Sequence, residues 1–365
     1  MSQRSLAEQS FVTSGSGDAD SPRGRLLVAS CGSGDYLAGA VVDRYRTRLT
    51  DVGEDRSVLH LKSIDFRFSD SETCVCLEAD VNGCDAFLFQ ALLDPSSGRS
   101  VDQNYMAFLI AARALREWGA NHVTAVLPYL AYARQDKPSR FRREPTTAKL
   151  MADLSVESGI DRLVTYHPHT SRIQGFYGGT PVDGLDSLPL FGHEFSDFRG
   201  RDDVVAIAPD AGASKFVTCF GRALDLTCAI ASKHRPRPEE AVISEIIGDL
   251  AGKRVALVLD DMISSGGTVY ALLTMLSRRS QIEEVYLGVS HNLCTRPAWE
   301  RLVELQAEHH LVQVIATNSI PQAEEFRTLP FFSVRDLSET LAWVINHIHY
   351  NRSVGEVACA IEKPQ

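Results

Sequence analysis

The 365-residue chain is long enough for about two domains, and its 44% hydrophobic and 23% charged residues are typical of a globular protein. A formal net charge of −10 argues against a general binder of nucleic acid or anionic membranes, because both need a surplus of Lys and Arg facing phosphates. No apolar run approaches the roughly 18 to 20 residues of a membrane span, and the start MSQRSLAEQS lacks the apolar core of a secretory signal. We therefore expect a cytoplasmic protein without nucleic-acid or membrane partners.

Residues 1–24 are rich in Ser, Gly, Asp and Arg and have almost no apolar periodicity, which predicts a disordered leader. From Arg25 onward, short apolar runs alternate with helical patterns. The predicted strands lie in RLLVAS, HVTAVLPYL, DRLVTYHPH, DVVAIAPDAG and RVALVLDD, and the predicted helices in YMAFLIAARALREWGA, TTAKLMADLSVESG, SKFVTCFGRAL and TVYALLTMLSRR.

The predicted strands are nearly continuous in Val, Ile, Leu and Ala, as are strands buried on both faces. This pattern indicates α/β architecture, with parallel sheets covered by helices. The spacing predicts two doubly wound domains, spanning 25–184 and 185–355 and followed by a tail at 356–365.

The eight cysteines are scattered without a CxxC pair. A chain of this length has core enough to fold without disulfides, so we expect free thiols, most of them buried. Cys74 and Cys76 would share one face of a strand, but two ligands do not make a zinc site, and core packing is the favoured interpretation.

The segment VALVLDDMISSGGTVYALLTML (Val255–Leu276) joins a buried strand to a helix through polar residues. Asp260 and Asp261 would complement a helix dipole in the simplest interpretation. Ser264–Thr268 then combine backbone freedom, hydroxyl groups and a helix N-terminus, so several N–H groups can converge on one phosphate. Because carboxylates accept hydrogen bonds from vicinal hydroxyls, the pair beside this loop predicts a sugar phosphate, ribose 5-phosphate.

The same segment resembles the loop that binds phosphoribosyl pyrophosphate (PRPP), shared by phosphoribosyltransferases and PRPP synthetases. LPYLAYARQDK (Leu127–Lys137) resembles the ATP-site signature of the ribose-phosphate pyrophosphokinases, the PRPP synthetases, and phosphoribosyltransferases lack it. Further stretches match this family in the same order: FSDSETCV (Phe68–Val75), HTSRIQGF (His169–Phe176), PVDGL (Pro181–Leu185), APDAGASK (Ala208–Lys215) and SKHRPR (Ser232–Arg237). The resemblance spans about residues 25 to 355.

The resemblance implies an α/β fold of two phosphoribosyltransferase-like doubly wound domains, each with a mainly parallel sheet flanked by helices. It implies a ribose-phosphate diphosphokinase that moves the β,γ-diphosphoryl group of ATP to the C1 hydroxyl of ribose 5-phosphate, giving PRPP and AMP. Mg²⁺ is the implied cofactor. The implied assembly is a homo-oligomer built on dimers, such as a hexamer, because the family's FSDSE stretch serves a neighbouring subunit's site.

Site residues carry over from the matching motifs. Lys233 and Arg235, which would otherwise be a solvated basic loop, are the implied catalytic pair, since diphosphoryl transfer needs mobile positive charge. The implied ATP contacts are Phe68, Asp70, Glu72, Arg134, Gln135 and His169. The implied ribose 5-phosphate contacts are Asp210, Asp260, Asp261, Ser264, Ser265, Gly266, Gly267 and Thr268. The implied metal ligands are His169, Asp183 and Asp210, and Lys215 is either a crevice residue or a surface residue.

Three features depart from the family pattern. His167 stands where an aspartate is common, and Gly178 or Gly179 where a second acid is usual. His167 and His169 could together hold a softer metal, but His169 acting alone is favoured. SHNLCTRPAW (Ser290–Trp299) also differs from the stretch linked to regulation, so control by ADP or phosphate is not assumed.

Two other functions compete with the enzyme. A regulatory subunit that resembles PRPP synthetase but lacks activity would have altered catalytic motifs, whereas Lys233, Arg235, Arg134, Asp260 and Asp261 are intact. A phosphoribosyltransferase would explain the Asp260 loop but not the Arg134-Gln135 signature.

Overall fold

A computed structural model describes residues 11, 21–53, 58–139, 141–234 and 242–355, which form two compact units. The first unit comprises the described residues up to Leu185 together with those from Asp336 onward, and the second comprises Asp186–Arg335. Residues 336–355, expected in the second domain, therefore group with the first unit instead. Most of the predicted leader lies outside the described residues, but Ser21 is buried and Arg23 pairs with Asp85, so 21–24 belong to the ordered fold.

The first unit contains a six-stranded sheet in the order β2-β1-β5-β6-β7-β8, with every pairing parallel. Its strands are β1 (Arg25–Ser30), β2 (Leu59–Leu61), β5 (Cys84–Phe89), β6 (His122–Val126), β7 (Arg162–Tyr166) and β8 (Val182–Leu185), with a separate antiparallel hairpin of β3 (Asp65–Arg67) and β4 (Thr73–Val75). Its helices are α1 (Asp35–Asp51), α2 (Val101–Glu117), α3 (Thr147–Glu157), α4 (Ile173–Phe176) and α10 (Ser338–His349), after a 3₁₀ turn at Gly32–Gly34.

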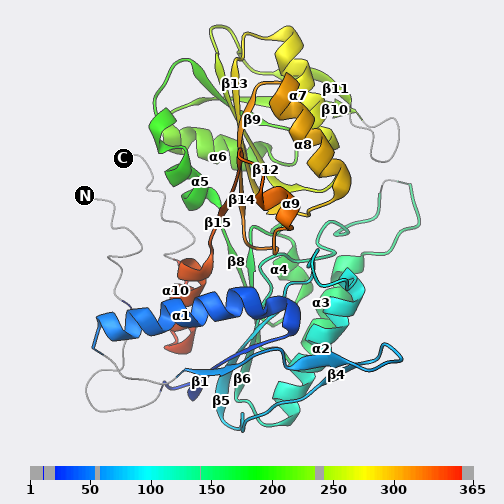
Figure 1. Cartoon of the computed structure of the whole chain (residues 1–365), viewed down its shortest axis with the longest axis vertical. Coiled ribbons are helices and arrows are strands. Elements are labelled where there is room, and N and C mark those ends of the chain that lie inside the picture. Colours follow the sequence, from blue (N-terminus) through cyan, green and yellow to red (C-terminus); the bar gives the residue numbers. More distant parts are fainter. Residues whose placement is uncertain (1–10, 12–20, 54–57, 140, 235–241, 356–365) are drawn as a thin grey trace. The chain divides into compact units, whose positions relative to one another are not determined.

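Helix α10 reaches the first unit from the far end of the chain and lies beside α1 (Figure 1). The Asn346 amide donates to the Tyr45 hydroxyl at 3.1 Å, and Arg48 forms an ion pair with Glu339. Burial of Trp343 and Ile345 shows that this helix is part of the core of the unit.

The second unit contains a seven-stranded sheet in the order β11-β10-β9-β12-β13-β14-β15, parallel except for β10 against β11. Its strands are β9 (Val204–Ala208), β10 (Thr227–His234), β11 (Val242–Ile247), β12 (Val255–Ile263), β13 (Glu284–Asn292), β14 (Leu311–Thr317) and β15 (Phe332–Arg335). Its helices are α5 (Leu188–Glu194), α6 (Ser214–Leu224), α7 (Gly267–Arg279), α8 (Arg296–Glu308) and α9 (Glu324–Arg327), with a 3₁₀ turn at Ser196–Phe198.

Both faces of the second sheet are buried. Successive residues of a strand point to opposite faces, and those of β9 join two different apolar clusters. On β9, Val204 and Ala206 join the cluster that contains Phe220 of α6, whereas Val205 joins the cluster that contains Leu272 of α7. The two clusters explain why these strands are almost continuously apolar. The predicted α/β class, with mainly parallel sheets flanked by helices, is confirmed.

The seven described cysteines are free thiols, as expected, and Cys359 lies outside the described residues. The expectation that most are buried is wrong: only Cys31 and Cys84 of this set are buried, and Cys76 is exposed beyond the end of β4. None of the helices in the described part of the chain is both long and apolar enough to cross a bilayer.

Candidate functional site

The chain reverses its direction across the second sheet between β9 and β12. From β9 it passes through α6 to β10 on one side, and from β12 it passes through α7 to β13 on the other. In open α/β sheets the ligand crevice lies outside the carboxyl ends of the strands at such a switch point. Asp210 follows β9 and Asp260 lies near the end of β12, so sequence-predicted site residues lie at this switch point.

The aspartates at this edge affect one another's charge. Burial raises the pKa of Asp260 well above its usual range, and the neighbouring charges of Asp261 and Asp210 add to the shift. The amide of Asp261 donates to Asp260 Oδ1 at 3.0 Å, and the amide of Gly212 donates to Asp210 Oδ1 at 2.9 Å. Cations or hydroxyl donors would relieve the crowding, which suits a polyhydroxylated ligand or a hard divalent ion.

The sequence suggested that strand β12 ends on the aspartate pair, but it does not. It continues to Ile263, because the ladder with β13 extends through the pairing of Ile263 with Asn292. Ser264 therefore begins the loop directly at the sheet edge. Gly266 then has φ of +74°, and α7 starts at Gly267.

The carbonyl groups of Ser264 and Ser265, at the start of this loop, accept hydrogen bonds from side chains later in the chain. Thr295 Oγ1 donates to the Ser264 carbonyl at 2.7 Å, and the Arg301 guanidinium donates to the Ser265 carbonyl. Within the described residues, no backbone hydrogen bond is donated by the amides of Ser265 and Gly266. Unpaired amides at the start of a helix bind anions well.

Thr295 and Arg301 were missed by the sequence analysis. Thr295 caps α8, since its hydroxyl accepts from the Ala298 amide, and a threonine followed by Arg-Pro is a readable helix start. Arg301 lies inside α8 and carries no local pattern that points to a loop more than thirty residues earlier.

The predicted catalytic pair lies at the limit of the described chain. The backbone of Lys233 pairs with Ile243 near the end of β10, its side chain lies outside the described residues, and so does Arg235. Because β10 runs parallel to β9, the carboxyl end of β10 lies at the same edge of the sheet as Asp210. Lys215 is exposed on the first turn of α6.

In the first unit, the predicted ATP residues follow neighbouring parallel strands. Arg134 and Gln135 are exposed in the loop after β6, and His169 is exposed after β7. The Asp136 carboxylate lies 3.6 Å from the Arg172 guanidinium, which joins the two loops, and Arg172 belongs to the HTSRIQGF stretch. The structure therefore brings these two predicted motifs together.

Phe68, Asp70 and Glu72 occupy the turn of the β3–β4 hairpin, where Ser71 has φ of +78°. The Phe68 ring is 50% exposed and packs edge-on against the exposed Phe66 ring, with centroids 5.3 Å apart. No hydrogen bond or ion pair joins these three residues to Arg134 or Gln135 in the described chain. The hairpin thus presents two aromatic rings to the outside of its own unit.

Asp183 does not converge with His169. Its carboxylate forms a 2.8 Å ion pair with Arg162, the first residue of β7, and it pairs with Val164 in the ladder. His169 lies beyond the opposite, carboxyl end of β7. His167 has φ of +38°, and its amide donates to the Leu185 carbonyl at 2.7 Å.

Known proteins resemble this chain over most of its length. Residues 26–159 match the family described as the N-terminal domain of ribose phosphate pyrophosphokinase, and residues 221–358 match the phosphoribosyl synthetase-associated domain. A ribose-phosphate pyrophosphokinase of Fusobacterium nucleatum is 34% identical over 293 residues, which cover 80% of this chain and 88% of the relative. One from Bacillus subtilis is 33% identical over 79% of this chain and 86% of its own length. The crystal structure of phosphoribosylpyrophosphate synthetase from Mycobacterium smegmatis superposes with a TM-score of 0.73 at 30% identity, covering 90% of this chain and 99% of that one.

Proposed function

Because this chain belongs to the ribose-phosphate pyrophosphokinase family, we propose that it transfers the β,γ-diphosphoryl group of ATP to the C1 hydroxyl of ribose 5-phosphate, giving PRPP and AMP. The observation that carries this assignment is the switch point of the second sheet. There, crowded aspartates and a loop with open amides lie on adjoining strand ends, as a pentose phosphate requires.

In the second unit, the phosphate of ribose 5-phosphate is bound by Ser264, Ser265, Gly266, Gly267 and Thr268. The N–H groups at the start of α7 donate to its oxygens, and the helix dipole favours its charge. Asp260 and Asp261 accept hydrogen bonds from the ribose hydroxyls, and Asp210 faces the same edge from β9. These contacts hold the C1 hydroxyl in place for in-line attack on the β-phosphorus.

In the first unit, Arg134 and Gln135 bind ATP from the loop after β6, and His169 contributes from the loop after β7. Phe68, Asp70 and Glu72 bind the nucleotide of a neighbouring subunit. An exposed aromatic pair at a hairpin turn supports this role, since an adenine ring stacks on such a surface. The active assembly is accordingly a homo-oligomer built on dimers, and both substrates are cytoplasmic metabolites.

Lys233 and Arg235 stabilise the transferring diphosphoryl group. Lys233 lies near the end of β10 and Arg235 comes after it in the chain, and β10 pairs in parallel with β9, which Asp210 follows. This order supports a role for their positive charge at the Asp210 edge of the sheet. Lys supplies a compact charge and Arg a bidentate grip on phosphate oxygens. No strong base is needed, since positioning and charge stabilisation account for most of this kind of catalysis.

Mg²⁺ fits the second unit better than the first. Asp210, Asp260 and Asp261 offer the carboxylate oxygens that Mg²⁺ prefers, and their mutual repulsion favours a cation. In the first unit, Asp183 is engaged with Arg162, so His169 is left as the protein ligand there. When bound, Mg²⁺ would neutralise phosphoryl charge, and the residues named above would bind and orient the substrates.

A coupled assay tests the proposal. We expect the full chain, given ATP, Mg²⁺ and ribose 5-phosphate, to form AMP and PRPP in equal amounts. Lys233→Ala should lower kcat by about 100-fold or more while ribose 5-phosphate binding changes by less than about threefold, because its charge acts on the transferring group. Lys62→Ala, at an exposed lysine of the first unit, is the control.

Two results would contradict these assignments. If Lys233→Ala turned over like the wild type, the role of this segment would be wrong. If no product formed with any divalent ion tried, an inactive regulatory subunit would explain the chain better. The relatives named above are ribose-phosphate pyrophosphokinases, which favours the enzyme.

A further inference from the structure

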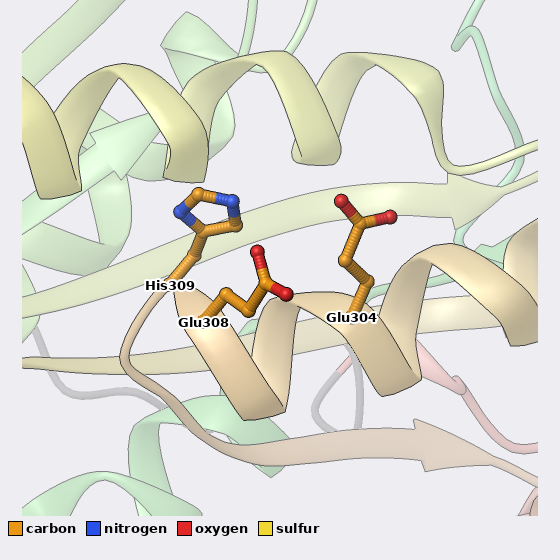
Figure 2. Close-up of side chains that lie close together, drawn as sticks. All are labelled: Glu304, Glu308 and His309. Atoms are coloured by element: carbon orange, nitrogen blue, oxygen red, sulfur yellow. The ribbon is translucent and has the colours of Figure 1, made fainter.

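A group of metal-binding side chains lies at the end of α8, apart from the residues assigned to either substrate. Glu304 and Glu308 are one helical turn apart, and His309 caps the helix. One potential ligand atom from each of the three lies within 4.8 Å of the other two. Figure 2 shows the imidazole and both carboxylates turned toward a common space beside the helix.

The tautomer of His309 leaves a metal-binding nitrogen open. Ser277 Oγ of α7 lies 2.8 Å from His309 Nδ1 and 3.0 Å from the Thr274 carbonyl, and a hydroxyl that donates to this carbonyl accepts from Nδ1. In that arrangement Nδ1 carries the hydrogen and Nε2 carries the lone pair that a metal ion needs. His309 is only 8% exposed, and Nε2 has no hydrogen-bond partner among the described residues. Figure 2 shows this nitrogen on the side of the ring that faces the two glutamates.

The two glutamates add negative charge, and neither forms an ion pair with a Lys or Arg within the described residues. Glu308 forms no hydrogen bond or ion pair within the described chain, and Glu304 accepts only from the Tyr270 hydroxyl, at 2.5 Å. Both glutamates are exposed, so their side chains can rotate to tighten around an ion. An imidazole nitrogen beside two carboxylates that form no ion pair in the described chain favours a cation over any other ligand.

Helix α7 orients two of the three ligands. Ser277 holds the ring of His309 and Tyr270 holds the carboxylate of Glu304, as partners behind metal ligands commonly do. Figure 1 shows α7 and α8 side by side, and their packing keeps these contacts together. The ligands are therefore partly organised before an ion arrives.

We propose that Glu304, Glu308 and His309 bind a divalent transition-metal ion, with Zn²⁺ as the ion of choice. One imidazole nitrogen and two carboxylates suit Zn²⁺ and leave a fourth position for water, whereas Mg²⁺ prefers oxygen ligands alone. The site is distinct from the cation of the phosphoryl transfer. All three ligands belong to α8 and its C-cap, and the side chains of Tyr270 and Ser277 that contact them belong to α7, the helix that begins at the phosphate loop.

Zinc binding to the full chain tests the site directly. The protein is freed of metal with a chelator, dialysed, and titrated with Zn²⁺ against a chromophoric competitor in millimolar Mg²⁺, which fills oxygen-only sites. The double variant Glu304→Gln, Glu308→Gln changes only exposed side chains and keeps an acceptor for Tyr270. His310→Asn removes the adjacent exposed imidazole at a residue with φ of +60°, which Asn tolerates, and Glu300→Gln removes another glutamate of α8; both are matched controls.

We expect the wild type and both controls to bind one equivalent of Zn²⁺ with similar affinity. The double variant should bind this equivalent about 100-fold or more weakly, because removing even a residue that only hydrogen-bonds to a metal ligand weakens binding by 10- to 100-fold. In ¹⁵N spectra of the wild type, binding of the first equivalent of Zn²⁺ should shift the Nε2 resonance of His309, while Nδ1 stays protonated. Equal Zn²⁺ affinity and stoichiometry in the wild type and the double variant would overturn the proposal. So would an unmoved Nε2 resonance when the equivalent is bound.

Discussion

Asp260 holds a carboxyl group that the fold drives toward its protonated form. Burial raises its pKa, and Asp261 and Asp210 add repulsion. An unfolded chain would titrate this group near pH 3.9. Between that value and the raised folded value, the native state binds more protons than the unfolded state, so stability falls as pH rises through this interval. Ionising Asp260 in the free protein therefore costs folding stability.

Asp260→Asn should therefore stabilise the free protein at neutral and higher pH. Asn keeps an oxygen that can accept from the Asp261 amide but carries no charge. We expect the melting temperature to rise by a few degrees at pH 8, and the difference from the wild type to shrink as pH falls toward about 4. Thermal melts across pH 5 to 8 measure this. Asp202→Asn, at an exposed aspartate, is the control, and a lower melting temperature for Asp260→Asn at pH 8 would refute the argument.

The loop that starts α7 depends on one backbone conformation. Gly266 has φ of +74°, and an added Cβ would meet nothing closer than the Ala298 Cα at 3.5 Å. The demand for glycine is therefore conformational, because a left-handed residue costs other side chains about 1–2 kcal/mol. The position of the amides of Ser265 and Gly266 depends on that conformation.

Gly266→Ala should raise the KM for ribose 5-phosphate by about tenfold, since 1.4 kcal/mol corresponds to that factor. Gly266→Asn should be affected less, because Asn adopts positive φ more readily than Ala. Initial-rate measurements at saturating ATP separate the KM from kcat. Equal KM values for wild type and Gly266→Ala would show that the loop does not bind the phosphate through its backbone.

Buried strands and the turn that begins α7 could be predicted from the sequence, because each depends on residues that are close together in the chain. Apolar runs predicted the buried strands, and Asp-Asp followed by Ser-Ser-Gly-Gly-Thr predicted the turn into α7. The hydrogen bond from Arg301 to the Ser265 carbonyl of this loop could not be predicted, since it depends on how α8 packs. The approach of Asp210 to Asp260 likewise needed the pairing of β9 with β12, and the capture of Asp183 by Arg162 needed the register of β7 against β8.

At the scale of the whole chain, sequence order and spatial order diverge in the first unit. Its sheet is built from residues before 186, yet α10 is supplied from beyond residue 335. An amphipathic helix at the end of a chain packs equally well in principle on any open apolar face, so its sequence alone does not reveal its destination. The position of α10 is specified by polar contacts between segments that are distant in the sequence.

A buried cluster of polar and charged groups joins three such segments, namely the chain around Arg23, strand β5 and helix α10. Asp85 of β5 is fully buried and accepts from the Arg23 guanidinium at 3.0 Å and from His349 Nδ1 of α10 at 2.8 Å. Ser21 also donates to the His349 carbonyl. A carboxylate in this position is tolerated only because its partners are present, and removing it leaves Arg23 without a counter-ion.

Asp85→Asn should therefore loosen the first unit alone. Breaking a buried pair costs about 3–5 kcal/mol, so amides of β5 and α10 that exchange by global opening of this unit should exchange about 100-fold faster or more. Hydrogen–deuterium exchange resolves the two units separately, and β12 to β14 in the second unit serve as an internal reference. Asp153→Asn breaks an exposed pair with Lys149 in the same unit and should change exchange by about twofold. If Asp85→Asn behaved like Asp153→Asn, the cluster would be incidental to the docking of α10, and the apolar contacts of Trp343 and Ile345 would have to hold the helix unaided.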